Sequence, residues 1–171
     1  MLDVIIKGGT VVAPGGASVM DVGIEGEKIV AVAAPGTLDN GSARIIDAPG
    51  QIVLPGGIEP HTHINVPVPD YWAGGKSEVF TQPPEAASRA AAFGGVTTYV
   101  DFAGNLPLNP GAVPPAEPIM SQIDKRRQTF TGHSYTDFTF HYILAGAVSP
   151  QTIGEIGRAD RKSTRLNSSH S

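Results

Sequence analysis

Hydrophobic and polar positions in the first fifty residues follow the pattern of short β-strands. The strand-like runs are rich in β-branched residues and cover residues 4–7, 10–12, 21–25, 28–32 and 44–47. Gly8-Gly9 between the first two runs predicts a bend or bulge, and Gly26-Glu27 between the third and fourth predicts a hairpin turn. We therefore predict a small antiparallel β-sheet unit over residues 1–50, with one face exposed to solvent.

From residue 51 onward, strand-like and helix-like patterns alternate along the chain. The strand-like runs cover residues 51–58, 97–102 and 137–144, and the helix-like runs cover residues 84–93 and 117–130. Pro84 suits the first turn of a helix, and Gly94-Gly95 marks its end. Strand and helix in this order predict consecutive βαβ units with parallel strands and right-handed crossovers. We place these units at residues 51–154.

Residues 155–171 resemble translated sequencing adapter more closely than protein. Residues 160–170 match a common adapter read codon by codon, and residues 156–159 match the start of a second copy. We therefore predict that residues 155–171 are a non-native tail and leave them out of the fold prediction. A natural, disordered tail rich in Ser and Arg is the alternative.

The amino-acid composition and net charge limit which binding partners and which kinds of metal site this chain can have. Of the 171 residues, 40% are hydrophobic and 16% charged, which is typical of a globular protein. A net charge of -4 without a basic stripe argues against nucleic acid or an acidic membrane surface as a partner. The absence of cysteine excludes disulfides and thiolate metal sites and suits a cytoplasmic location. No apolar run approaches the ~20 residues of a membrane helix.

His61-Thr62-His63 is the segment with the clearest chemistry. In a strand, residues i and i+2 point to the same side, so both imidazoles can bind one metal ion. Imidazole suits zinc, iron, nickel and manganese-class ions, and the C-terminal ends of the strands form the catalytic face of a (β/α) barrel. An isolated H-x-H pair is more often incidental than functional, so the surrounding sequence decides its meaning.

That surrounding sequence resembles the hydantoinase/dihydropyrimidinase branch of the amidohydrolase superfamily. Residues 53–63 resemble the first barrel strand of the family, residues 90–102 resemble the second strand with its preceding helix, and residues 137–142 resemble the third. The stretches that resemble the family's N-terminal β-sandwich half are 3–12, 23–32 and 45–48. The resemblance implies an α/β fold, in which an incomplete TIM-type (β/α) barrel follows a small antiparallel β-sandwich half.

By the same resemblance, His61 and His63 bind the more buried of two divalent metal ions, expected to be zinc. The family completes its site with a carboxylated lysine, two more histidines and an aspartate, all expected downstream of this chain. The catalytic residues are therefore not assigned, and Lys76, in the loop after the first barrel strand, is not the bridging lysine. The full-length protein is expected to be a homotetramer that opens a hydantoin or dihydropyrimidine ring to an N-carbamoyl amino acid, and this chain alone is expected to be inactive.

Two alternatives stay open. The full-length protein can instead be a catalytically silent, dihydropyrimidinase-like assembly protein, although a scaffold has no need of a histidine pair. It can also be a related cyclic amidohydrolase that acts on allantoin or dihydroorotate. The loop over residues 65–77 is longer than the usual connection, which leaves the substrate open.

Several other residues are candidates for the site. Asp101 ends a strand and can support a histidine, but a carboxylate that caps the next loop is the preferred interpretation. For His141, a packed or hydrogen-bonded histidine is preferred over a metal ligand. Tyr71 and Trp72 either line a substrate pocket or cover the rim of the barrel. The histidines without supporting context are His133 and His170.

Overall fold

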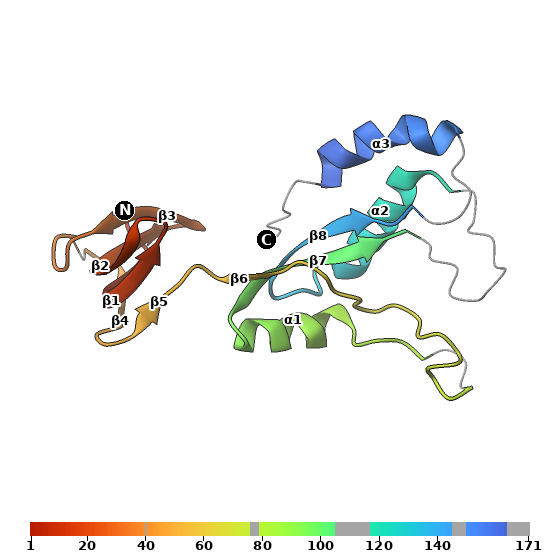
Figure 1. Ribbon diagram of the computed structural model, residues 1–171. Coiled ribbons are helices and arrows are strands. Elements are labelled where there is room, and N and C mark those ends of the chain that lie inside the picture. The colour runs from red at the N-terminus through yellow and green to blue at the C-terminus, as the bar shows by residue number, and fades with distance from the viewer. Residues whose placement is uncertain (40, 76–78, 105–116, 145–149, 164–171) are drawn as a thin grey trace. The chain divides into compact units, whose positions relative to one another are not determined.

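The computed structural model describes residues 1–39, 41–75, 79–104, 117–144 and 150–163 of the chain. The chain divides into two compact units, Met1–Pro55 and Gly56–Ser171, each with its own β-sheet (Figure 1). The first unit extends past residue 50, because Ile52 and Val53 pair with its first strand. The prediction that these two residues begin a barrel strand is therefore wrong.

The first unit is a five-stranded sheet in the order β3-β2-β1-β4, with β5 also paired to β1. Its strands are β1 (Val4–Ala13), β2 (Gly16–Glu25), β3 (Lys28–Ala33), β4 (Arg44–Asp47) and β5 (Ile52–Val53). The antiparallel pairs β1–β2 and β2–β3 include the predicted hairpin, but β4 and β5 run parallel to β1. The sheet is mixed, not antiparallel as predicted, because the connection between β3 and β4 returns the chain to the other edge of β1 instead of making a hairpin.

The Gly8-Gly9 pair forms the predicted irregularity in β1, since the register with β2 shifts between Ile6 and Gly9. Gly8 has a φ of 66°, a left-handed conformation that glycine adopts without strain. Its N–H donates to Asp21 Oδ1 at 2.8 Å, and Gly36 N–H donates to Asp21 Oδ2 at 2.7 Å. The Asp21 side chain is buried, and these two backbone donors, Gly36 first and then Gly8, hold the pKa of its carboxyl below the usual range.

Replacing Asp21 with asparagine is expected to destabilise the first unit by about 1.5–3 kcal/mol at neutral pH, the range for hydrogen bonds to a charged group. Asparagine keeps one acceptor oxygen but turns an amide N–H towards the second backbone donor. Because the folded pKa of Asp21 is lowered, its stabilisation is complete above the unfolded pKa of roughly 3.9 and is lost as pH falls through the folded value. Urea unfolding at pH 7 and pH 3 measures both effects.

Asp47→Asn is the matched control, because Asp47 is an exposed carboxylate of the same unit. Equal unfolding free energies for Asp21→Asn and the parent at pH 7 would contradict the prediction.

The second unit contains three parallel strands in the order β6-β7-β8. The strands are β6 (Gly57–Glu59), β7 (Val96–Ala103) and β8 (Asp137–Tyr142), and the helices are α1 (Pro84–Phe93), α2 (Ile119–Phe130) and α3 (Pro150–Ser163). Figure 1 shows α1 in the connection from β6 to β7 and α2 in the connection from β7 to β8. The predicted βαβ order and the parallel pairing are therefore confirmed, as is the range of the first helix.

The core of the second unit lies where α2 packs on one face of this sheet. Its buried aromatic and aliphatic residues include Tyr99, Phe130, Phe138, Phe140, Ile119 and Ile123. Because side chains alternate along a strand, Tyr99, Asp101 and Ala103 share the face of β7 towards α2. Val100 and Phe102, which alternate with them, lie on the opposite face.

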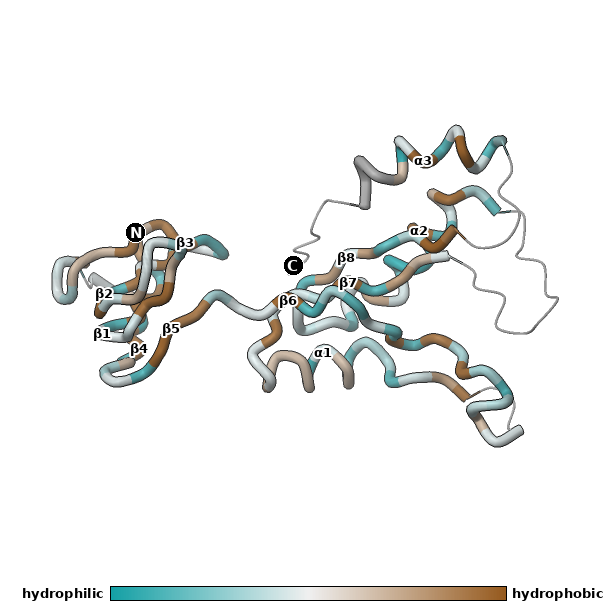
Figure 2. Tube along the Cα trace, viewed as in Figure 1, coloured by the Kyte–Doolittle hydropathy of each residue, from teal (hydrophilic) through white to brown (hydrophobic). Residues whose placement is uncertain are grey.

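Helix α3 includes residues 155–163, which belong to the predicted non-native tail. Ile119 N–H donates to Glu155 Oε2 at 2.8 Å, and Ala159 is buried against the core. Figure 2 shows hydrophobic and polar residues interspersed along the coloured part of this helix. The non-native origin of residues 155–171 stays a prediction. Among the helices that the structure describes, none is long and apolar enough to cross a bilayer.

Candidate metal centre

The chain carries His61 and His63 just past the end of β6. Regular strand structure ends at Glu59, but Thr62 N–H donates to Val100 O at 3.1 Å. The segment therefore continues alongside β7 in an extended conformation. This places both histidines at the carboxyl end of the parallel sheet, where ligands of open α/β sheets and barrels bind.

The two imidazoles converge. His61 Nε2 and His63 Nε2 lie 3.2 Å apart, and both side chains are exposed. Two nitrogen ligands of a tetrahedral zinc ion, each about 2.0–2.1 Å from the metal, lie roughly 3.3–3.4 Å from each other. The same separation also allows one imidazole to donate a hydrogen bond to the other. The pair therefore fits a divalent metal in both chemistry and spacing.

Phe102 lies beside both histidines, a placement that the sequence pattern did not single out. Its ring centroid is 4.6 Å from that of His61 and 5.0 Å from that of His63, on which it stacks at 22°. Side chains of β7 point alternately to its two faces, so Phe102 lies on the face opposite the buried Asp101. This alternation could have predicted that Phe102 lies on the side of the histidines. An aromatic ring beside the histidines limits their rotation and shields one side of the pair from water.

His141 lies close to this group without joining the pair. It is the cross-strand neighbour of Phe102 in β8, with ring centroids 5.3 Å apart. Its Nε2 is 3.2 Å from Pro60 O, a distance at which the imidazole donates a hydrogen bond to the carbonyl. The structure thus agrees with the interpretation of His141 as a hydrogen-bonded histidine.

Asp101 contacts the histidine segment but neither imidazole. Its fully buried carboxylate accepts hydrogen bonds from Ile64 N at 2.8 Å and from Thr62 Oγ1 at 2.9 Å, both to Oδ2. Its Oδ1 forms an ion pair with Arg126 Nη2 at 2.5 Å. The sequence favoured a carboxylate that caps the loop after its own strand, β7. That interpretation is incomplete, because Asp101 also binds the loop after the neighbouring strand, β6.

The remaining candidates lie outside this arrangement. Tyr71 and Trp72 are exposed in the loop between β6 and α1, with ring centroids 5.4 Å apart. His133 is exposed in the turn after α2. Lys76 and His170 lie outside the described residues.

The two histidines by themselves are too few for a typical protein metal site. Among the residues that the structure describes, no three His, Cys, Asp or Glu side chains come together in a group that could hold a metal ion. Zinc in proteins usually has three or four protein ligands. The described part of the chain therefore presents two candidate ligands at a strand end, fewer than the three or four of established zinc sites.

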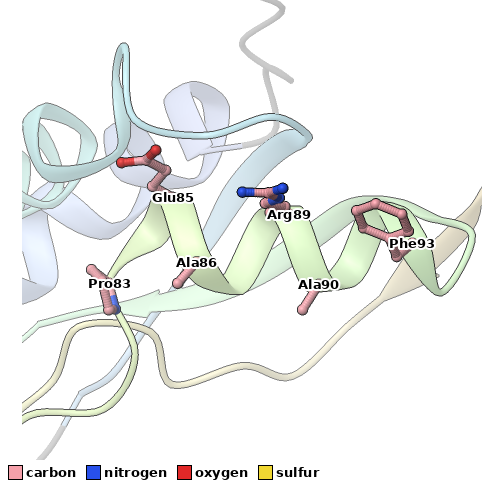
Figure 3. Close-up of a pocket in the computed structure, with 6 residues that line it drawn as sticks. All are labelled: Pro83, Glu85, Ala86, Arg89, Ala90 and Phe93. Atoms are coloured by element: carbon pink, nitrogen blue, oxygen red, sulfur yellow. The ribbon is translucent and has the colours of Figure 1, made fainter.

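Described residues of the second unit also line pockets that neither histidine enters. One runs along α1, where Glu85, Arg89 and Phe93 project from one side of the helix (Figure 3). The other, about 260 Å³ in volume, has Phe102 and Arg126 in its lining. Neither pocket is lined by His61 or His63, so neither enlarges the candidate metal centre.

Comparisons with known proteins point to enzymes that hydrolyse cyclic amides. No protein-family profile matches the chain. A D-hydantoinase from Geobacillus stearothermophilus is 36% identical over 141 residues, which cover 82% of this chain and 26% of that protein. An allantoinase from Escherichia coli strain SMS-3-5 is 40% identical over 108 residues, which cover 63% of this chain and 20% of that protein.

The fold is also similar to that of solved structures. The crystal structure of a dihydropyrimidinase from Brevibacillus agri NCHU1002 superimposes with a TM-score of 0.72 at 32% identity, covering 90% of this chain and 29% of that one. The chain thus spans less than a third of the length of each of these three relatives.

Proposed function

We propose that this chain, a relative of the hydantoinase and dihydropyrimidinase family of amidohydrolases, supplies two metal ligands to a hydrolase that opens cyclic amides. The observation that carries the proposal is the convergence of His61 Nε2 and His63 Nε2, 3.2 Å apart, beyond the end of β6. We assign this sheet to the first three units of a (β/α) barrel and the first unit to half of a β-sandwich, on the likeness to longer relatives.

In the proposed mechanism, His61 and His63 would hold a divalent ion through their imidazole Nε2 atoms. Such an ion, when bound, lowers the pKa of water and polarises an amide carbonyl. Phe102 keeps the two imidazole rings in place by stacking and edge contact. Hydrolysis adds water across one ring C–N bond, which converts a hydantoin or dihydropyrimidine to an N-carbamoyl amino acid.

Several finer properties rest on the family resemblance. We propose two zinc ions per subunit, a homotetramer and a cytoplasmic location for the intact protein. The absence of cysteine in this chain is compatible with that location. Imidazole ligands suit zinc, copper, iron and nickel, and zinc is proposed among these ions on the family resemblance.

Removing the metal from the protein made from the complete gene is expected to abolish hydrolysis of its cyclic-amide substrate. A bound divalent ion would supply both a water of lowered pKa and the polarisation of the carbonyl, so removing the ion should take both effects away. Activity is measured after dialysis against a chelator and again after addition of zinc. Elemental analysis should find about two divalent ions per subunit.

A zinc-saturated chelator serves as the control, because it exposes the protein to the same chelator without removing its zinc. A metal-free protein that hydrolyses its substrate at the parental rate would overturn the proposal.

A second substrate class is favoured by the 40% identity to an allantoinase. Hydantoin, dihydrouracil, dihydroorotate and allantoin should therefore be assayed side by side. The substrate with the highest kcat/KM identifies the class. Metal binding without turnover of any of the four would favour the catalytically silent assembly protein.

A further inference from the structure

We propose that Asp101 and Arg126 act as a pair of positioning residues for the metal-binding histidines. In this role they fix the backbone from Thr62 to Asn65, so that His61 and His63 keep their Nε2 atoms convergent. The inference rests on the proposed function, because it concerns the two histidines as metal ligands.

The Asp101 carboxylate is fully buried and uses both of its oxygens. Oδ2 accepts from Ile64 N and Thr62 Oγ1 at 2.8 and 2.9 Å. Oδ1 accepts from the Phe102 N–H at 2.7 Å and from the guanidinium of Arg126. A single carboxylate thus joins the histidine segment, the end of β7 and α2.

Arg126 holds the same segment from the side of α2. Its Nη2 and Nε donate to Asp101 Oδ1 at 2.5 and 3.2 Å, its Nη1 donates to Asn65 O at 3.3 Å, and its Nη2 also donates to Ile64 O. The guanidinium carbon lies 4.7 Å from the centroid of the Phe130 ring. The planar guanidinium therefore bridges one carboxylate and two consecutive carbonyls, an arrangement that lysine cannot reproduce.

The alternation of side chains along residues 61–64 connects this network to the two imidazoles. Thr62 and Ile64 alternate with His61 and His63, and neighbouring side chains of an extended segment point to opposite sides. The Thr62 N–H donates a hydrogen bond to Val100 O, and the Thr62 hydroxyl donates one to the Asp101 carboxylate. When Thr62 and Ile64 are fixed towards α2, the two histidines are fixed on the opposite side, against Phe102.

The composition of the network favours positioning over simple stabilisation. A buried ion pair adds little net stability compared with apolar residues of similar volume, because both charges lose their hydration. Here four hydrogen bonds of the pair are directed at one short segment, residues 62–65: three at its backbone and one at the Thr62 hydroxyl. Groups that orient metal ligands in this way typically change metal affinity 10- to 100-fold when they are mutated.

The test compares three variants of the intact, zinc-loaded protein. Asp101→Asn weakens the ion pair, and Arg126→Lys keeps a cation but loses the bridge to the two carbonyls. Tyr99→Phe is the control from the same strand: it removes a 2.8 Å hydrogen bond to Ser134 without touching residues 61–65. Zinc affinity is measured by competition with a chromophoric chelator, and ligand geometry by the visible spectrum of the cobalt-substituted protein. Urea unfolding gives the stability of each variant.

Asp101→Asn and Arg126→Lys are expected to bind zinc roughly 10- to 100-fold more weakly and to change the cobalt spectrum. Tyr99→Phe should change affinity less than about twofold, although it too is destabilised. If Asp101→Asn does not fold, Arg126→Lys decides the outcome. Parental zinc affinity and cobalt spectrum in the folded variants would overturn the inference and leave the proposed function standing. A parent protein that binds no zinc would overturn both.

Discussion

In the intact protein, His61→Ala is expected to lower kcat/KM for the proposed cyclic-amide substrate by at least about 10- to 100-fold. The substitution removes one of two imidazoles whose Nε2 atoms lie 3.2 Å apart. Loss of residues that merely orient metal ligands costs 10- to 100-fold, and loss of a ligand itself should cost no less. Zinc content should fall together with activity.

The fold should survive this substitution, because the His61 side chain is exposed and lies outside the buried core. Surface substitutions away from special features usually change stability by no more than about 0.5 kcal/mol. His133→Ala is the matched control, since His133 is an exposed histidine in the turn after α2. Parental turnover by a His61→Ala protein would remove this residue from the metal centre, whereas loss of activity in both variants would indicate a nonspecific effect.

The 171-residue chain by itself is expected to show no measurable hydrolysis of cyclic amides. Within its described residues, two histidines converge and no third His, Cys, Asp or Glu completes a metal group with them. Two imidazoles hold zinc weakly compared with the three or four protein ligands of established sites. We therefore expect zinc to be lost on gel filtration and dihydrouracil to stay intact.

The purified chain should be assayed with excess zinc present, so that weak binding does not hide activity. The His61→Ala variant of the same chain gives the background rate. Zinc-dependent turnover above that background would show that this chain contains a complete active site.

Local sequence determined the secondary structure of this protein to a large extent. Pro84 and Gly94-Gly95 delimit α1, because proline suits a first helical turn and glycine terminates a helix. The β-branched and aromatic run of β7 and the alternation of strand and helix predicted the parallel βαβ order. These features depend on neighbouring residues, so they can be read without knowing the tertiary fold.

The sequence also predicted that the two histidines lie together, because the side chains of residues i and i+2 share one side of an extended chain. Long-range pairing was not. β5 joins β1, and β4 runs parallel to β1, through hydrogen bonds between residues about forty positions apart in the sequence. A strand pattern shows which residues can pair but does not select the partner or its direction.

The surroundings of the histidines were likewise decided by tertiary structure. Asp101 and Arg126 are 25 residues apart, and neither has a local pattern that predicts an ion pair beneath residues 62–65. The contact forms because α2 packs on the face of β7 that carries Asp101, which places a guanidinium, a carboxylate and the loop after β6 within hydrogen-bond distance. Sequence alone indicated the histidine pair as the candidate metal ligands, and the packing of helix on sheet decided which groups contact the segment that carries them.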